Sequence, residues 1–373
     1  MGWLAAVPPA LALIYAGWQA YNYSYWRRAV LSRSAGGELP FISIIVPFRN
    51  EAHNLRRLLL SIARQRYPED RYELVLVDDH SSDGGAAGAN PFPKNSQLLR
   101  LADHPLPTGT VAFKKAALSL GIAHATGSVI VTTDADCEWA PGVLLQLGRR
   151  FAAGADVVLG PVLVEPVTDF CSAFQALDLA GYQLFTAATI AAGTPALANG
   201  AHFAFRRSAF ERVGGYAGVD HLPSGDDVLL LHKFAAAGTF RIECSTAVGG
   251  VVTTRPVAGW GAFWRQRLRW AGKSGDYTSM ALRVAQALAF LNSLAILGGL
   301  LVGVLNGVFA LVALGAWLIK GMADWVLLRS VCHHYGYGRL TRWYLSAQLI
   351  YPFYLVAIGT AALLGVKAEW KGR

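Results

Sequence analysis

The chain has 373 residues, of which 54% are hydrophobic and 15% charged, and its formal net charge is +9. The length predicts about two structural units of ~150 residues each, and the composition is too apolar for an ordinary soluble enzyme, yet too charged in the middle for a pure membrane bundle. A basic chain can bind nucleic acid, but much of this charge flanks apolar segments, so we expect a membrane bilayer and no nucleic acid as a partner.

The N-terminal segment predicts a first membrane span. The run Trp3–Tyr25 is apolar, long enough to cross a bilayer, and followed by Arg27, Arg28 and Arg33. A cleavable signal peptide is disfavoured, because no basic residue precedes the run and no small-residue cleavage site clearly ends it. We expect residues 1–27 to form a transmembrane helix, with the segment after it in the cytoplasm. Four scattered cysteines, none in CxxC spacing, agree with a reducing compartment.

Residues 40–250 alternate between short β-rich runs and segments with helical periodicity. Strands are expected at 41–46, 73–77, 97–101 and 128–133, and helices at 51–66 and 115–124. Strand, helix and strand in succession predict parallel pairing with a right-handed crossover. The pattern therefore predicts an open, mostly parallel α/β sheet, whose ligands bind beyond the carboxyl ends of its strands.

The C-terminal segment, residues 283–373, is again apolar. Membrane helices are expected at 283–304, 308–328 and 343–365. Together with the N-terminal helix they give about four transmembrane helices. Lys320 and Asp324 lie one helical turn apart inside the middle span, where charges are costly and normally pair or face water. We interpret them as a self-satisfied ion pair that locks the bundle, and a role in holding an acceptor is the alternative.

Three acidic clusters follow expected strands or precede an expected helix. In chain order they are Asp78–Asp79, Asp134 with Asp136, and Asp226–Asp227. Because residues two apart on an extended chain point the same way, Asp134 and Asp136 can converge on one hard cation, Mg²⁺ or Mn²⁺, which would neutralise a diphosphate leaving group. Taken singly, a DxD pair is often a surface turn, acids before a helix often only complement its dipole, and Lys114 is by default a solvated lysine.

A basic and aromatic segment, WRQRLRW, lies within residues 255–282, which we expect to be interfacial. On a helix, Gln266, Arg269 and Trp270 share one face. A guanidinium binds phosphate bidentately, and an indole gives a flat wall on which a sugar ring stacks. An amphipathic helix lying on the bilayer is the alternative, but the acidic clusters upstream favour ligand binding.

Taken together, the motifs resemble the family 2 glycosyltransferases. The similar segments are PFRNE (47–51), VDDHSSDG (77–84), Lys114, DAD (134–136), SGDD (224–227) and QRLRW (266–270). More narrowly, they resemble the membrane-bound branch that includes cellulose, hyaluronan and poly-N-acetylglucosamine synthases and ceramide glucosyltransferases. The resemblance spans residues 41–273 and implies a GT-A fold, a nucleotide-sugar donor, a divalent cation and inversion at the anomeric carbon.

The resemblance also implies roles for individual residues. Donor binding falls to Pro47, Arg49 and Glu51 at the nucleoside, Asp79 or alternatively Asp78 at the base, Lys114 at the nucleotide, and Asp134, Gln266 and Arg269 at the diphosphate. The metal falls to Asp136 with Asp134, the general base is Asp227 with Asp226 beside it, and Trp270 floors the acceptor site. SGDD replaces the commoner acidic pair with Glu first, which leaves the choice between Asp226 and Asp227 open. AGKS after the tryptophan, in place of ARG, leaves the neighbouring acceptor contacts open.

The predicted protein is an inverting, metal-dependent hexosyltransferase with a GT-A-type α/β domain and a membrane domain. It would move a sugar from a nucleotide-diphosphate sugar, expected to be UDP-linked, to a lipid or lipid-linked acceptor at the cytoplasmic face of a bacterial inner (plasma) membrane. A processive polysaccharide synthase is the alternative, although four spans are few to enclose a polymer channel. A non-catalytic regulatory membrane protein that binds nucleotide-sugars is the alternative from another class. The sequence names neither the sugar nor a protein partner.

Overall fold

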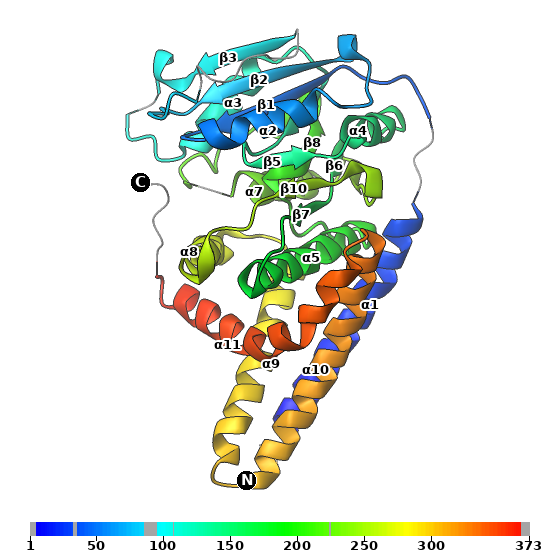
Figure 1. The fold of residues 1–373 in the computed structure, drawn as a ribbon, viewed down its shortest axis with the longest axis vertical. Helices are drawn as coiled ribbons and strands as arrows, with labels where there is room; N and C mark the ends of the chain where they lie inside the picture. The colour runs from blue at the N-terminus through cyan, green and yellow to red at the C-terminus, as the bar shows by residue number, and fades with distance from the viewer. Residues whose placement is uncertain (1–4, 33–35, 86–94, 107, 224, 367–373) are drawn as a thin grey trace. The chain divides into compact units, whose positions relative to one another are not determined.

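Two compact units make up the chain in the computed structural model, which describes residues 5–32, 36–85, 95–106, 108–223 and 225–366 (Figure 1). The sheet unit comprises Ala29–Glu165 and Ile190–Arg255, and the helical unit comprises Met1–Arg28, Pro166–Thr189 and Pro256–Arg373. The segment Pro166–Thr189 therefore belongs to the helical unit, although it lies inside the expected catalytic segment 40–250.

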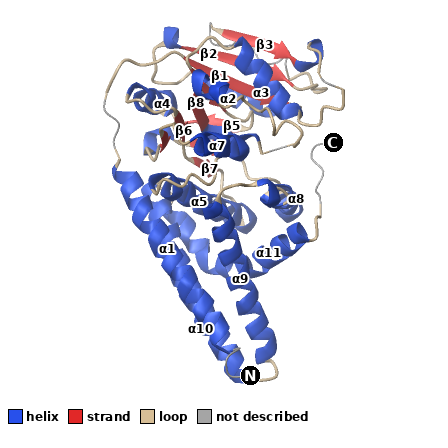
Figure 2. Cartoon of the chain, turned by 180° about the vertical axis from the view of Figure 1, so that it is seen from behind, coloured by secondary structure: helices blue, strands red, loops and turns tan. Residues whose placement is uncertain are grey.

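A seven-stranded mixed sheet forms the centre of the sheet unit (Figure 2). Its strands, in spatial order, are β3 (Ser96–Arg100), β2 (Tyr72–Asp78), β1 (Ile42–Phe48), β4 (Val129–Thr132), β8 (Phe203–Arg206), β6 (Val157–Leu159) and β9 (Ile242–Cys244). Pairing is parallel from β3 to β4 and between β6 and β9, and antiparallel on both sides of β8. Every residue of β1 and β2 is buried, as in sheets covered on both faces. The predicted mostly parallel α/β sheet is confirmed.

Helices connect and cover these strands. They are α2 (Ala52–Ile62), α3 (Phe113–His124), α4 (Val143–Ala152), α6 (Arg207–Arg212) and α7 (Asp226–Ala237). Helix α3 packs closely on β1 and β2 because Gly121 has no side chain: a Cβ there would lie 2.6 Å from Ile45 Cγ2 and 3.1 Å from Val77 Cγ2. The strands and helices predicted between residues 41 and 133 are present, with ends that differ by up to about one helical turn.

A second, three-stranded sheet was not predicted. Its strands, in spatial order, are β5 (Cys137–Trp139), β10 (Val252–Thr254) and β7 (Val162–Val164). A strand of three residues is too short to show an alternating pattern. This sheet matters for the site because β5 begins directly after Asp136. Its neighbour β10 comes from a distant part of the chain and so brings distant residues close to Asp136.

Long helices form the helical unit. They are α1 (Val7–Leu31), α5 (Phe170–Ala191), α8 (Gly259–Ala271), α9 (Met280–Gly303), α10 (Gly307–His334) and α11 (Tyr344–Leu363). Helices α9 and α10 are joined by a short turn, where Asn306 Oδ1 accepts a hydrogen bond from Val308 N (3.1 Å) and caps α10. This cap satisfies one of the amides left without a partner at the start of a helix.

Three helices of the described chain are long and apolar enough to cross a membrane, so the expectation of four was wrong. They are Met280–Gly303, Gly307–His334 and Gly338–Leu363. The expected N-terminal span corresponds to α1, which is too polar, and its polar groups bind α10 instead: Gln19 Nε2 donates to Asp324 Oδ1 (3.1 Å), and Trp26 Nε1 donates to Ser330 Oγ (3.0 Å). Helix α1 therefore runs beside α10 (Figure 1). Trp3, where the expected span begins, lies outside the described residues.

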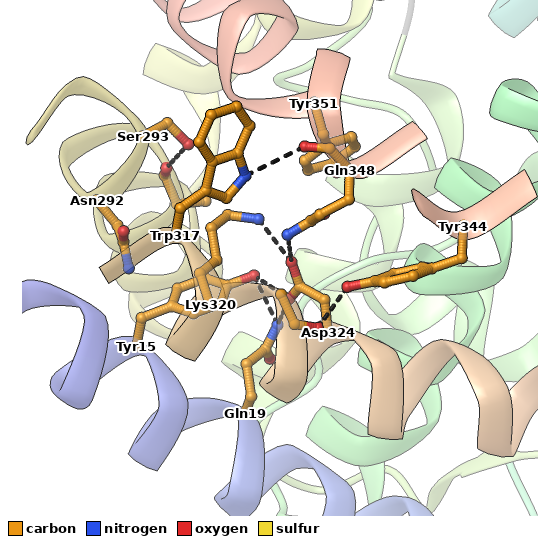
Figure 3. A network of polar contacts seen from close by, with 12 residues as sticks. Tyr15, Gln19, Asn292, Ser293, Trp317, Lys320, Asp324, Tyr344, Gln348 and Tyr351 are labelled. Atoms are coloured by element: carbon orange, nitrogen blue, oxygen red, sulfur yellow. Dashed lines mark hydrogen bonds and ion pairs between the residues drawn. The ribbon is translucent and has the colours of Figure 1, made fainter. Parts of the chain in front are cut away.

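The predicted ion pair between Lys320 and Asp324 is confirmed inside the helical unit (Figure 3). Lys320 Nζ lies 2.6 Å from Asp324 Oδ2, and the lysine side chain is 0% exposed. The carboxylate also accepts hydrogen bonds from the Tyr15 hydroxyl (2.7 Å), Gln19 Nε2 (3.1 Å) and Gln348 Nε2 (3.3 Å). Asp324 thus joins α10 to α1 and α11, which supports its interpretation as a lock between helices.

Candidate active site

The loops that follow β1 and β2 are joined by hydrogen bonds. Asn50, at a positive φ of 54°, donates its backbone N–H to Ser81 Oγ (3.0 Å) and accepts from Ser82 N through Oδ1 (2.8 Å). Asp83 Oδ2 accepts from Ala52 N (2.8 Å). These contacts hold the two loops together at the carboxyl ends of adjacent parallel strands, which is where ligands of open α/β sheets bind.

Five of the predicted donor-binding residues lie on these strands and loops. They are Pro47, Arg49, Glu51, Asp78 and Asp79. Pro47 is buried in β1 and paired with a residue of β2, whereas Arg49 and Glu51 are half-buried. Asp79 Oδ1 lies 2.9 Å from Nδ1 of His80. Asp78 Oδ1 accepts a hydrogen bond from the backbone N–H of Ser81, in the loop that follows β2 (2.9 Å). The structure therefore gathers these five residues at one edge of the sheet.

A lysine and three carboxylates from separate parts of the chain meet in the sheet unit. Lys114 Nζ, in the first turn of α3, lies 2.8 Å from Asp134 Oδ1 and 3.2 Å from Asp226 Oδ2. Asp227 Oδ2 accepts a hydrogen bond from Gly200 N (2.8 Å). A Cβ on Gly200 would lie 3.3 Å from Asp226 Oδ2 and 3.5 Å from Lys114 Nζ, so this glycine borders the cluster directly. Four residues predicted from three separate motifs are thus brought together.

Burial and charge shift the pKa values in this cluster. Burial acts to lower the pKa of Lys114, but Asp134, Asp226 and Asp227 outweigh it and raise that pKa well above its usual value. Lys114 is therefore a fixed cation. Burial, followed by the charge of Asp226, raises the pKa of Asp227, and Lys114 opposes this rise. A raised pKa makes a carboxylate a better proton acceptor in a reaction near neutral pH.

Asp136 is bound by a residue of the second sheet. Its Oδ2 accepts from Thr254 Oγ1 of β10 (3.3 Å), and burial, with the charges of Asp134 and Glu51, raises its pKa to about 6. Within the residues that the structure describes, no group of three or more His, Cys, Asp or Glu side chains is arranged to hold a metal ion. Mg²⁺ is commonly bound by only one or two carboxylates plus substrate phosphates and water. The mutual repulsion of Asp134 and Asp136 therefore fits a cation that arrives with a diphosphate.

The other predicted site residues lie on α8 of the helical unit. Gln266, Arg269 and Trp270 all lie on this α-helix, so the predicted helix is confirmed. Their side chains are half-buried. The ring of Trp270 lies 6.2 Å from the ring of Tyr182 on α5. These residues belong to the helical unit, whereas Lys114 and the carboxylates belong to the sheet unit, and the structure groups each set within its own unit.

Sequence reasoning missed a buried ion pair beside this motif. Arg267, between Gln266 and Arg269, has a side chain only 4% exposed, and its Nη2 lies 2.7 Å from Asp178 Oδ2 on α5. Asp178 is the only charged residue of α5. A carboxylate buried in an apolar helix requires a cation or hydrogen-bond donors. The sequence therefore indicated that Asp178 needs a partner, but it did not indicate which residue that partner is.

A buried histidine near the carboxylates was also missed. His202 is 1% exposed, its Nδ1 lies 3.2 Å from Pro161 O, and its ring stacks on Trp139 with a centroid distance of 6.4 Å. Burial lowers its pKa to about 4, so the imidazole is neutral at pH 7. Residue 160 must be glycine, because a Cβ there would lie 2.0 Å from His202 Cε1.

Comparison with known proteins extends these observations. The model of Glycosyl transferase family 2 matches residues 43–214, and that of Glycosyl transferase family group 2 matches residues 129–364. The chain is 30% identical over 256 residues to Probable glycosyltransferase YdaM of Bacillus subtilis, covering 63% of this chain and 55% of that protein. It is 27% identical over 269 residues to Glycosyltransferase AglE of Haloferax volcanii, covering 70% and 82%. It is 28% identical over 246 residues to Beta-monoglucosyldiacylglycerol synthase of Trichormus variabilis, covering 63% and 49%.

The chain thus spans about half the length of the first and third of these relatives. Among solved structures, mannosyltransferase PcManGT from Pyrobaculum calidifontis, in complex with GDP-Man and Mn²⁺, is similar with a TM-score of 0.61 and 22% identity, covering 98% of this chain and 100% of that chain. At this identity the likeness shows the fold, which is GT-A-like. Because the longer family match covers more than half of the chain, the chain belongs to the family 2 glycosyltransferases.

Proposed function

We propose that the chain is an inverting glycosyltransferase that moves a sugar from a nucleotide-diphosphate sugar, UDP-linked, to a lipid or lipid-linked acceptor. The observation that carries this proposal is the cluster of Lys114, Asp134, Asp226 and Asp227. It combines a fixed cation for a departing diphosphate with a buried carboxylate that can take a proton. From the resemblance of its motifs, we also propose that the chain belongs to the membrane-bound branch of its family.

Asp227 is the proposed general base. The acceptor hydroxyl attacks the anomeric carbon while the bond from that carbon to the diphosphate oxygen breaks, and the hydroxyl proton passes to Asp227. Attack from the face opposite the diphosphate inverts the configuration. The hydrogen bond from Gly200 N orients one oxygen of Asp227, whereas Asp226 is paired with Lys114. Because Asp226 is paired with this cation, we assign the role of general base to Asp227, with Asp226 as the alternative.

The donor is held on the side of Lys114. The ammonium of Lys114 stabilises negative charge as it develops on the departing diphosphate. Asp134 and Asp136 would hold a Mg²⁺ or Mn²⁺ ion, which when bound neutralises the same diphosphate. The nucleoside would contact Pro47, Arg49, Glu51 and Asp79, with Asp78 as the alternative contact for the base.

Further substrate-binding roles are proposed for three residues of α8. Arg269 presents a bidentate guanidinium suited to phosphate oxygens, and Gln266, one turn before Trp270, would bind the same diphosphate. Trp270 would form the floor on which the acceptor sugar or headgroup stacks. All three side chains are half-buried, so each keeps some surface for a ligand.

A lipid acceptor is supported by two observations. Three helices of the described chain are long and apolar enough to cross a membrane, as expected for an enzyme that acts on lipids. Some relatives carry names that include lipids: beta-monoglucosyldiacylglycerol synthase, already compared, and Undecaprenyl-phosphate 4-deoxy-4-formamido-L-arabinose transferase of Edwardsiella ictaluri, 30% identical over 128 residues, or 32% of this chain. We place the enzyme in a bacterial plasma membrane with the sheet unit in the cytoplasm, where nucleotide-sugars are made.

The proposal is tested with the full chain reconstituted in lipid vesicles. Radiolabelled UDP-glucose, UDP-galactose, UDP-N-acetylglucosamine and GDP-mannose are supplied singly with Mn²⁺, and the products are separated into lipid extract and polymer. Label in the lipid extract, lost in Asp227→Asn, is the expected result. Label in a polymer indicates a processive synthase instead. Binding of a nucleotide-sugar without label in any product indicates a regulatory protein.

A further inference from the structure

We infer that Asp178, Arg267 and Tyr351 form a positioning triad for the acceptor side of the site. The triad fixes the side chains of Gln266 and Trp270 on α8. This inference rests on the proposed function, in which Trp270 floors the acceptor site, and it assigns a role to a buried network that the proposed reaction does not use directly.

The guanidinium of Arg267 touches both flanking residues of the motif. Its Nη1 donates to Gln266 Oε1 at 2.9 Å, and its Cζ lies 4.1 Å from the centroid of the Trp270 ring. Its Nε and Nη2 both bind Asp178 Oδ2, at 2.8 Å and 2.7 Å. With the side chain 4% exposed, Arg267 acts on a ligand only through the residues it holds.

Asp178 fixes the direction of that guanidinium. Its side chain is 1% exposed, and its second oxygen, Oδ1, accepts a hydrogen bond from the Tyr351 hydroxyl at 3.1 Å. The carboxylate on α5 therefore binds one residue of α8 and one residue of α11. Because both of its oxygens are occupied, rotation of the carboxylate would break contacts with two helices at once.

Tyr351 links the triad to the ion pair inside the apolar helices. The Nζ of Lys320 lies 5.1 Å from the centroid of the Tyr351 ring, within the range of a cation–π contact, and the same ammonium is bound to Asp324 at 2.6 Å. Figure 3 shows Tyr351, Lys320 and Asp324 in one network. A continuous chain of polar contacts thus runs from α10 through α11 and α5 to the motif on α8.

Geometry, more than stability, explains why such a network is buried. The cost of removing two charges from water cancels much of their attraction, and well-packed apolar residues can replace a buried pair without loss of stability. A planar guanidinium bound at fixed angles, by contrast, holds its neighbours in one orientation. For an indole that must lie flat under a sugar ring, orientation is the property that matters, since a misplacement of ~1 Å can cost ~10²-fold in rate.

The position of Trp270 is measured without reference to activity. The full chain in lipid nanodiscs is labelled with fluorotryptophan, and the fluorine resonance of Trp270 is assigned with Trp270→Phe. Asp178→Asn and Tyr351→Phe are the informative variants, because each weakens the triad without altering a direct contact of the ring. Arg265→Met, which changes an exposed arginine of the same helix, is the matched control. We expect the Trp270 resonance to shift or broaden in the first two variants and to stay unchanged in the control.

Activity then shows whether the position matters. We expect Asp178→Asn to lower transfer to acceptor by as much as ~10²-fold, mainly through a higher acceptor KM. Slow hydrolysis of the donor should fall much less, because only Gln266 of the two positioned side chains is assigned to the donor. Introduced into Trp270→Ala, the same change should have a much smaller effect on transfer, limited to the part that acts through Gln266, because residues that act through one another are not additive. Tyr351→Phe, which removes one hydrogen bond and keeps the ring, should give a smaller change in the same direction if Asp178→Asn folds poorly.

Each outcome of these experiments either supports or overturns the proposed triad. An unchanged Trp270 resonance in both variants overturns the triad. Equal losses of transfer activity from Asp178→Asn in the wild-type and Trp270→Ala backgrounds also overturn the triad. Asp178 would then act independently of Trp270, through the general stability of the protein. A third outcome combines a shifted Trp270 resonance in Asp178→Asn with an unchanged ratio of transfer to hydrolysis in both Asp178→Asn and Trp270→Ala. This outcome supports the positioning of Trp270 by the triad but shows that Trp270 has no role at the acceptor.

Discussion

Asp226 and Asp227 are adjacent in the sequence but have different partners in the structure. Asp226 pairs with Lys114 at 3.2 Å, whereas Asp227 accepts the amide of Gly200 at 2.8 Å. We expect Asp227→Asn to lower the transfer rate ~10²–10⁴-fold and to leave donor affinity near wild type, because the amide keeps the shape of the carboxylate but takes no proton. Steady-state transfer assays and donor-binding calorimetry measure the two quantities.

Asp226→Asn is the matched control for this prediction. It removes a partner of Lys114, so it should weaken donor binding more than Asp227→Asn does. Near wild-type turnover in Asp227→Asn, with a steep loss in Asp226→Asn, would assign the base to Asp226 instead.

Removal of divalent cations should stop transfer. Asp134 and Asp136 repel one another, and such paired carboxylates favour a hard cation bridging to a diphosphate. We expect excess EDTA to abolish transfer and Mn²⁺ to restore it, and Asp136→Asn to raise the Mn²⁺ concentration required for half-maximal rate. Full transfer by protein freed of metal in excess EDTA would contradict this role. Exposed Asp70→Asn serves as the control and should keep the wild-type Mn²⁺ requirement.

His202 makes the stability of the sheet unit depend on pH. Its pKa is about 4 in the folded state and near 6.5 in an unfolded chain, so between these values only the unfolded state binds the proton. The contribution is therefore fully present above pH ~6.5 and is lost as the pH falls toward ~4, by at most about 3 kcal/mol. We expect thermal unfolding of His202→Asn to show a weaker loss of stability over this range than wild type. His53→Asn, at an exposed position, should keep the wild-type slope.

Single residues were predictable from the sequence only where a motif named them. Lys114, Asp134, Asp226 and Asp227 were predicted from spacing and resemblance, and the structure brings them together. Their partners were not predictable, because Gly200 enters the cluster through its backbone amide, which every residue but proline carries.

Elements were predictable in proportion to their length. The strands β1 and β2, seven residues each, appear in the sequence as continuous apolar runs, whereas the three-residue strands β5, β7 and β10 do not. The apolar run at the N-terminus predicted a span, but the polar side chains of α1 bind α10. Hydropathy alone does not show whether a polar side chain on a helix finds a partner on another helix, so the count of spans was too high.

The buried pair on α10 should respond differently to single and double replacement. Asp324→Leu leaves the fully buried Lys320 without its partner and should lower the free energy of unfolding by about 3–5 kcal/mol. The double variant Lys320→Met with Asp324→Leu should recover most of that loss, because no charge then remains buried. Unfolding in mixed micelles measures both, and Leu318→Ala, at a position 68% exposed, is the control. A double variant less stable than Asp324→Leu would show that the pair contributes net stability.

At the scale of the whole molecule, the division into units was less visible in the sequence than the fold of either unit. The segment Pro166–Thr189 lies between two parts of the sheet unit in the chain but belongs to the helical unit. Its helix, α5, carries Asp178, whose partners lie on α8 and α11. Such membership depends on contacts between residues far apart in the chain, for which local pattern gives no signal.

The charges around the candidate spans are distributed asymmetrically. The turn between α9 and α10, residues 304–306, contains no charged residue, whereas the short helix between α10 and α11, η7 (Gly338–Trp343), contains Arg339 and Arg342. Cytoplasmic loops of membrane proteins are enriched in arginine and lysine. This asymmetry agrees with the proposed orientation, in which η7 would lie on the cytoplasmic side and the α9–α10 turn on the opposite side of the membrane.

We therefore predict opposite accessibility for two introduced cysteines. Leu305→Cys lies in the α9–α10 turn, where the side chain is 91% exposed, and should react with a membrane-impermeant maleimide added to intact cells. Asp70→Cys, at an exposed position of the sheet unit, should react only after lysis, because nucleotide-sugars are supplied in the cytoplasm. Background labelling is low, since three of the four native cysteines are buried. Labelling of residue 70 in intact cells, or protection of residue 305 there, would reverse the proposed orientation and place the catalytic carboxylates on the side without a supply of donor.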